Sequence, residues 1–157
     1  IESGNMSFHC EDCSAHHFAE TVYQTHQVII LPPVEFIKEF PDEDVTIHID
    51  RMRLTQVITN FLGNAKKFTS QGHIKLGYFC DKEKKEIHIF VEDTGAGIPK
   101  EELQMIFERF YKRNEFVQGV GLGLAISKVI VEKMNGHIDV QSEVNKGSRF
   151  TAVLPYL

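Results

Sequence analysis

A pair of asparagines and a lysine share one line along a helix predicted over residues 51–68. At about 100° per residue, Asn60, Asn64 and Lys67 fall on a border of the apolar face of that helix, away from its solvated side. Amide oxygens suit a hard cation, and an ammonium group can meet a phosphate. Asparagine is a poor helix former, so the stripe indicates a binding role, and a plain solvated border is the alternative.

Two glycine-rich loops offer further ligand contacts. Asp93 ends a predicted strand and precedes Gly95 and Gly97, which let the backbone approach a flat ligand closely. The Asp93 carboxylate is placed to accept a hydrogen bond from an exocyclic amine, the alternative being a tight turn that it stabilises. The run GVGLGL at 119–124 leads into a predicted helix whose free N–H groups suit phosphate oxygens. Its spacing is neither that of a Walker loop nor that of a Rossmann fingerprint.

Helices and strands must position these residues, and hydrophobic periodicity predicts where those elements lie. A helix begins near an N-cap at Ser14, carries an apolar stripe from Phe18 to Ile30 and is ended by Pro32. The other predicted elements are strands 34–40 and 45–49 around a turn at 41–44, the helix 51–68, a hairpin of strands 73–80 and 86–93, a short helix after Pro99, a helix over about 122–134 stopped by Asn135-Gly136, and strands 137–142 and 148–154.

This order of elements predicts an α+β fold, a two-layer α/β sandwich. We expect a mixed five-stranded sheet backed by about three helices, with the site among helices and loops on the covered face.

The composition excludes several classes of protein. The 157 residues fit one domain, and apolar residues at 42% and charged residues at 25% are ordinary for a globular chain. Lys and Arg number 17 against 22 Asp and Glu, so a net charge of −5 leaves no broad basic surface for nucleic acid. Uncharged stretches fall far short of the ~20 residues that span a bilayer, so we expect no direct membrane contact. The start at Ile1, without an initiator Met or a signal-peptide pattern, indicates a piece of a longer protein.

Three cysteines, an odd and low count, favour a reducing compartment over a disulfide scaffold. Cys10 and Cys13 lie among His9, His16 and His17, a cluster that invites a zinc site. No second ligand pair follows at the usual spacing, so a segment without metal is the alternative that we favour.

Taken in order, the motifs resemble the catalytic, ATP-binding domain of the sensor histidine kinases over nearly the whole chain. Residues 56–69, QVITNFLGNAKKFT, resemble the N box of that family, and residues 91–99, VEDTGAGIP, its first glycine box. Residues 106–112, IFERFYK, resemble its F box, and residues 119–127, GVGLGLAIS, its second glycine box. The opening IESGNMSF is similar to the segment that joins the dimerisation helices of the family to the catalytic domain. The resemblance implies the Bergerat fold.

The resemblance also implies a role for each matching residue. Asn64 would be a Mg²⁺ ligand with Asn60 assisting, and Lys67 would meet the phosphates. Asp93 would accept from the adenine amino group, with Phe68 packed near the adenine. The remaining implied nucleotide contacts are Gly95, Gly97 and Ile98 around the base, Lys112 at the γ-phosphate, and Gly119, Gly121, Leu122, Gly123 and Leu124 at a lid hinge and helix start. The implied catalytic residues are Asn64, Lys67 and Lys112.

The implied reaction transfers the γ-phosphoryl group of ATP, held with Mg²⁺, to a histidine on a separate dimerisation domain. The phosphate then passes to the receiver domain of a response regulator. None of the eight histidines stands before an acid and a nearby proline, as a phosphoacceptor does, so we expect no self-phosphorylation. The resemblance further implies a connector at 1–13, an ATP-binding domain at 14–157 and a cytoplasmic location, with the parent protein free or anchored in the inner membrane.

Two alternatives stay open within the same superfamily. One is an ATPase, disfavoured because Asn60 stands where those enzymes carry a water-activating Glu. The other is a pseudokinase that senses or scaffolds nucleotide without phosphoryl transfer.

Overall fold

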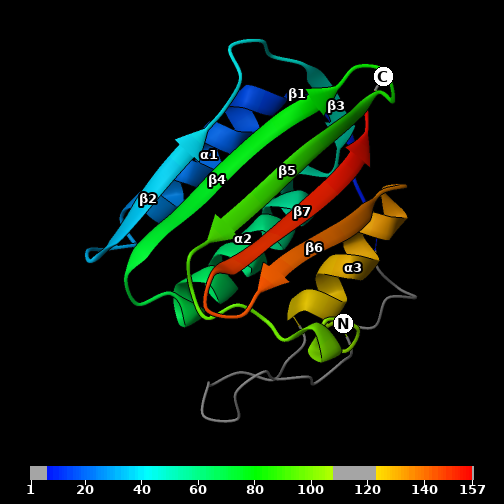
Figure 1. Ribbon diagram of the computed structural model, residues 1–157. Helices are drawn as coiled ribbons and strands as arrows, with labels where there is room; N and C mark the ends of the chain where they lie inside the picture. The colour runs from blue at the N-terminus through cyan, green and yellow to red at the C-terminus, as the bar shows by residue number, and fades with distance from the viewer. Residues whose placement is uncertain (1–6, 108–122, 157) are drawn as a thin grey trace.

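A mixed five-stranded sheet with helices on one face forms the centre of the molecule, in a computed structural model that describes residues 7–107 and 123–156. The strand order is β2-β4-β5-β7-β6, in which β2 runs parallel to β4 and the other neighbours pair antiparallel. The strands are β2 (Val34–Glu39), β4 (Gly72–Asp81), β5 (Glu86–Asp93), β6 (His137–Glu143) and β7 (Gly147–Pro155). The helices α1 (Ala15–Gln27), α2 (Arg51–Phe68) and α3 (Gly123–Lys133) all cover the same face (Figure 1). The predicted α+β sandwich is confirmed.

The core lies between that face and the helices. Along β5, Ile87, Ile89 and Val91 are buried in the core, which is the alternation predicted for a strand with one covered face. The side of α2 that meets them supplies Leu54, Val57, Ile58, Phe61, Leu62 and Ala65, each at most 2% exposed. Helix α2 therefore packs on the sheet along its apolar stripe, and this fixes which of its residues border the core.

Helix α2 has the bounds that the sequence predicts, because its first residue follows a strong cap. Asp50 is buried, and its Oδ1 accepts a hydrogen bond from the Arg53 N–H (3.1 Å). The other carboxylate oxygen accepts from the His9 N–H (2.8 Å). One side chain thus caps α2 and connects to it the segment before β1 (Glu11–Ser14).

Asp50→Ala is expected to lower the free energy of unfolding by about 1–3 kcal/mol, because it removes a helix cap and leaves the His9 N–H without its acceptor. Urea denaturation followed by circular dichroism measures the change. Asp42→Ala, in the exposed turn 41–44, is the matched control and is expected to shift stability by less than about 0.5 kcal/mol. Equal stabilities of the two variants would contradict this assignment.

The strands predicted around the turn 41–44 both form, but they belong to different sheets. Strand β3 (Thr46–Ile49) pairs antiparallel with β1 (Glu11–Ser14) in a separate two-stranded sheet, whereas β2 is an edge of the main sheet. Contacts distant in sequence decide this: Asp44 accepts hydrogen bonds from the Ser14 hydroxyl and from the His16 N–H (2.9 Å). The start of α1 therefore holds β3 beside β1. Part of the predicted connector, residues 11–13, lies in this pair.

Smaller differences concern helix ends. Ser14 caps α1 as predicted, accepting from the His17 N–H, but the helix ends at Gln27 rather than near Ile30. The short helix after Pro99 is a single 3₁₀ turn, η2 (Lys100–Glu102). Helix α3 stops as predicted before Asn135, whose φ of 66° is left-handed.

Candidate functional site

The polar stripe on α2 lies at the edge of the core, as predicted. Asn60 and Asn64 are half-buried, and Lys67 is exposed. The three side chains therefore follow one border of the helix from its middle to its last turn, where basic residues are favoured by the helix dipole.

Asn60 joins α2 to α3. Its side-chain nitrogen donates to the Gly123 carbonyl (3.1 Å) and to the hydroxyl of Ser127 (3.1 Å), which is fully buried. Because a carbonyl can only accept, the Asn60 amide nitrogen must point at α3, which leaves its oxygen as the atom to face a cation. Ser127 was not among the predicted site residues, although a polar residue inside the predicted helix 122–134 was a signal for it.

Asp93 lies at the end of β5, beside the first glycine loop. The residue is buried, and its Oδ1 accepts a hydrogen bond from the Gly95 N–H (2.8 Å). Burial raises the pKa of the carboxyl group above its ordinary value, and hydrogen bonds from the backbone N–H groups of Gly95 and Ser148 oppose part of that rise. A buried carboxylate with few partners is a strong acceptor for a ligand amine.

The glycine loop packs directly on the end of α2. A Cβ atom at Gly95 would lie 2.3 Å from the Phe68 carbonyl oxygen, and the Ala96 N–H donates to that same oxygen (3.2 Å). Thr69 caps the helix there, and its buried hydroxyl has no hydrogen-bond partner within the described residues. Asp93 and Phe68, the predicted adenine contacts, are thereby held on adjoining segments. The Thr69 hydroxyl lies at this end of α2.

The turn between β6 and β7 supports the other side of this loop. Gly97 has a φ of 75°, and a Cβ atom there would lie 2.1 Å from the Glu143 carbonyl oxygen. The buried Ile98 donates its N–H to the Ser142 hydroxyl (2.7 Å), which lies 2.8 Å from that of Ser148. Ser142 and Ser148 were predicted merely as strand ends, and no local signal marks them as supports of the loop.

The structure describes the second glycine box from Gly123 onward, where the box becomes helical. Gly123 begins α3, and Leu124 is half-buried. Lys112, Gly119, Gly121 and Leu122 lie outside the described residues, so their predicted roles stay predictions.

The cysteine–histidine cluster near the start does not gather around one point. Cys10 is exposed whereas Cys13 is buried, and burial raises the pKa of the Cys13 thiol, which disfavours the thiolate that binds zinc. Within residues 7–107 and 123–156, three possible metal ligands converge solely at Asp81, Glu86 and His88. The structure gives the predicted zinc alternative at Cys10 and Cys13 no support.

Comparison with known proteins decides the family. Residues 49–157 match the family described as "Histidine kinase-, DNA gyrase B-, and HSP90-like ATPase". The chain belongs to this family. The match covers α2 together with its cap Asp50, and it covers both glycine boxes, so this chain carries the ATP-binding ATPase domain of the family.

The relatives of this histidine kinase-like domain are sensor proteins. It is 39% identical over 128 residues to the sensor histidine kinase WalK of Bacillus subtilis, a match that covers 78% of this chain and 21% of WalK. It is 44% identical over 110 residues to the sensor protein SrrB of Staphylococcus aureus, covering 68% of this chain and 19% of SrrB. The matches thus span about a fifth of the length of these relatives.

Solved histidine kinases share the fold of the domain. The catalytic domain of histidine kinase ThkA, in a nucleotide-free form, superposes with a TM-score of 0.83 at 28% identity, covering 95% of this chain and 97% of that one. Full-length ShkA in complex with AMPPNP superposes with a TM-score of 0.87 at 27% identity, covering 96% of this chain and 32% of ShkA. The domain is therefore a catalytic ATP-binding domain of the sensor histidine kinase type. No helix in the described part of the chain is long and apolar enough to cross a bilayer.

Proposed function

We propose that this domain binds ATP with Mg²⁺ and delivers the γ-phosphoryl group to a histidine of a separate dimerisation domain. The observation that carries the proposal is the junction between the end of α2 and the first glycine loop. There the Phe68 carbonyl accepts from Ala96 beside the buried Asp93. That junction brings a carboxylate acceptor for the adenine amine next to the helix with Asn64 and Lys67.

The residues present fit such a ligand. At Gly95 a side chain would collide with the end of α2, so the loop offers bare backbone, and the buried Thr69 hydroxyl is a polar group left over for a ligand or a water. Mg²⁺, when bound, neutralises phosphate charge and orients the phosphates. Asn64 would hold the cation, with the Asn60 oxygen beside it, and Lys67 would neutralise phosphate charge. The other proposed nucleotide contacts are Lys112, Gly119, Gly121, Leu122, Gly123 and Leu124.

The main task of this domain in the reaction is to position the γ-phosphoryl group for attack by the imidazole nitrogen. The bond between the γ-phosphorus and its bridging oxygen breaks to release ADP, and a bond forms between that phosphorus and an imidazole nitrogen of the partner domain. A neutral imidazole nitrogen is itself a nucleophile, so the domain needs no general base. The phosphohistidine then passes its phosphoryl group to an aspartate of a response regulator.

Asn60 argues against the ATPase alternative. The Asn60 side chain donates to the Gly123 carbonyl, which an ionised carboxylate at this position cannot do. An amide also cannot remove a proton from water. We therefore propose that the domain hydrolyses ATP slowly at most.

A phosphoryl-transfer assay with labelled ATP tests the proposal. The chain alone is expected to gain no label, and the dimerisation domain of the parent protein is expected to gain acid-labile, base-stable phosphate when the chain is added. Phosphate release that is independent of the partner would instead favour an ATPase. ATP binding without transfer to the partner would favour a pseudokinase.

A further inference from the structure

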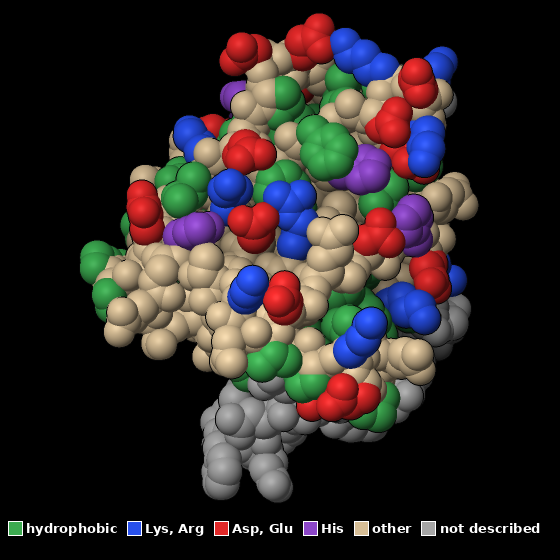
Figure 2. Space-filling view, in the orientation of Figure 1, with side chains coloured by type: hydrophobic (Ala, Val, Ile, Leu, Met, Phe, Trp, Pro, Cys, Tyr) green, Lys and Arg blue, Asp and Glu red, His purple; other side chains and the backbone are tan. Residues whose placement is uncertain are grey.

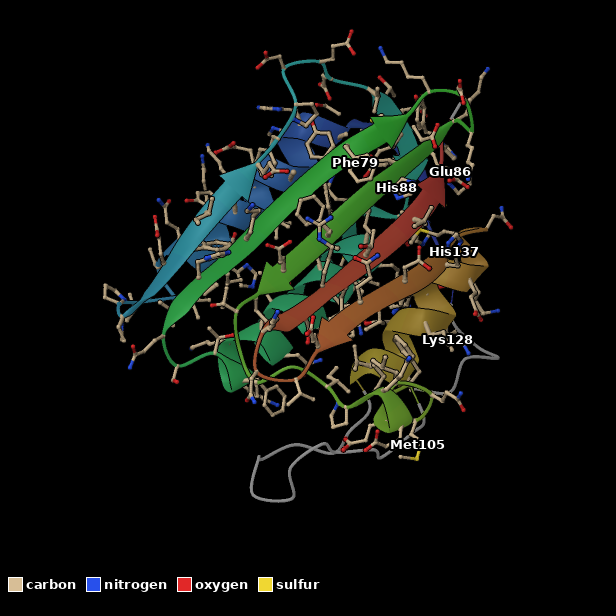
Figure 3. The ribbon with its side chains drawn as sticks, in the orientation of Figure 1. Phe79, Glu86, His88, Met105, Lys128 and His137 are labelled. Carbon is tan, nitrogen blue, oxygen red and sulfur yellow. The ribbon has the colours of Figure 1, made fainter. Side chains whose placement is uncertain are left out.

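A second group of ligand-type side chains lies on the outer face of the main sheet, the face that the helices leave uncovered. Figure 2 shows acidic, basic and histidine side chains mixed across this face. Where β4 and β5 meet their connecting turn, Asp81 stands directly opposite Glu86, and His88 follows two residues along β5. Side chains two apart on a strand point to the same side, so the three share this corner of the face. In Figure 3, Glu86 and His88 lie together there, beside Phe79.

The spacing of these groups suits one metal ion. One ligand atom from each of Asp81, Glu86 and His88 lies within 4.8 Å of the others. His88 Nε2 is 3.5 Å from Glu86 Oε1, longer than a good hydrogen bond. A tetrahedral zinc ion with bonds of about 2.0–2.1 Å holds its ligand atoms about 3.3–3.4 Å apart. The histidine and glutamate atoms are therefore already at a separation that such an ion needs.

The Nε2 atom of His88 is buried and makes no hydrogen bond in the part of the chain that the structure describes. Burying such a group without a hydrogen bond is unfavourable, so a nitrogen that lies within 4.8 Å of two carboxylates and bonds to neither points to a missing ligand. The Phe79 ring stacks on the imidazole at 4.6 Å between centroids and 20° between planes, which restrains the plane of the imidazole ring.

The Asp81 carboxylate is also held in place, and Lys82 of the connecting turn pairs with another carboxylate. Asp81 Oδ1 accepts hydrogen bonds from the N–H groups of Glu83 and Lys84, each at 3.1 Å, so the turn orients this carboxylate. Lys82 on the same turn pairs with Glu43 at 2.7 Å. The corner therefore keeps two carboxylates and one imidazole for a cation.

We propose that Asp81, Glu86 and His88 bind a divalent transition-metal ion, with Zn²⁺ as the best match. An imidazole ligand disfavours Mg²⁺ and Ca²⁺, which take oxygen ligands, and favours zinc and its neighbours. Three protein ligands leave one position for water. The site lies on the opposite face of the sheet from α2, so it is separate from the proposed nucleotide site, and it ties the β4–β5 turn end together.

Zinc titration by calorimetry into the EDTA-treated, nucleotide-free chain tests the site. The wild-type chain is expected to bind one Zn²⁺ ion, and His88→Gln and Glu86→Gln are each expected to weaken binding at least about tenfold. His73→Gln and His137→Gln are matched controls, because each histidine lies near a single carboxylate on the same face, at 3.8 Å from Glu92 and 3.6 Å from Asp139. Both controls are expected to keep wild-type affinity.

Further measurements test whether zinc binds at His88 and whether each variant is folded. Zinc is expected to shift the ring-nitrogen NMR signal of His88 and to raise the melting temperature of the wild-type chain but not of His88→Gln. Circular dichroism checks that each variant is folded. No zinc binding by the wild-type chain, binding unchanged by both His88→Gln and Glu86→Gln, or binding lost on Cys10→Ser would overturn the proposal.

Discussion

Asp93→Asn is expected to weaken ATP binding by roughly 10- to 150-fold. A hydrogen bond to a charged group contributes about 1.5–3 kcal/mol, and each 1.4 kcal/mol is a factor of ten in affinity. The Asn side chain keeps the size of Asp and an oxygen for the Gly95 N–H, which now donates to Asp93 Oδ1. Its second polar atom is then an amide nitrogen, so a donor would face the donor amine of adenine.

The same substitution is expected to raise stability at neutral pH. The pKa of Asp93 is raised above its ordinary value of 3.8, chiefly by burial, so the folded chain binds this proton more tightly than the unfolded chain does. The contribution of Asp93 to the free energy of unfolding is therefore fully present below pH 3.8. It is lost as the pH rises through the folded-state pKa. A neutral Asn avoids that loss. The difference in stability between Asp93→Asn and the wild-type chain is therefore expected to shrink as the pH falls toward 3.8.

Calorimetric titration of ATP with Mg²⁺ and urea denaturation at two pH values measure the two effects. Asp139→Asn, an exposed carboxylate on β6, is the matched control and is expected to change neither quantity. Loss of ATP binding together with a gain in stability would be the signature of a ligand-binding carboxylate. Unchanged ATP affinity in folded Asp93→Asn would refute the role that we propose for Asp93.

Gly97→Ala is expected to lower the free energy of unfolding by more than about 2 kcal/mol and to abolish measurable ATP binding. A left-handed conformation costs an L residue about 1–2 kcal/mol, and Gly97 has a φ of 75°. The new Cβ atom would also lie 2.1 Å from the Glu143 carbonyl oxygen, a backbone atom that cannot rotate away. The loop that follows Asp93 must then move off the β6–β7 turn.

Gly63→Ala is the matched control within the same motif set. Gly63 is an exposed residue of α2, and a Cβ atom there meets nothing within 4 Å. Since Ala is a better helix former, this variant is expected to gain about 0.5–1 kcal/mol and to keep ATP affinity. Urea denaturation and ATP titration compare the two glycines. A Gly97→Ala protein as stable as Gly63→Ala would show that the loop tolerates a side chain.

Local pattern was sufficient for much of the fold. The bounds of α2, the pairing of β4 with β5 and the stop of α3 at Asn135 all follow from periodicity, a cap or a turn within a few residues. The partners of β2 and β3 did not follow from local pattern. Strands β2 and β3 have similar alternation, and the bonds from Ser14 and His16 to Asp44 place β3 outside the main sheet.

The candidate site divides in the same way. The sequence alone determined the types and order of the ligand groups, because the asparagine stripe and the Asp-x-Gly-x-Gly loop are spacings along one chain. The tertiary structure decided which groups meet: Asn60 with Ser127, and Ile98 with Ser142. Each of these contacts joins separate elements, and their distance depends on how helices and strands pack, which hydrophobic burial fixes without leaving a local mark.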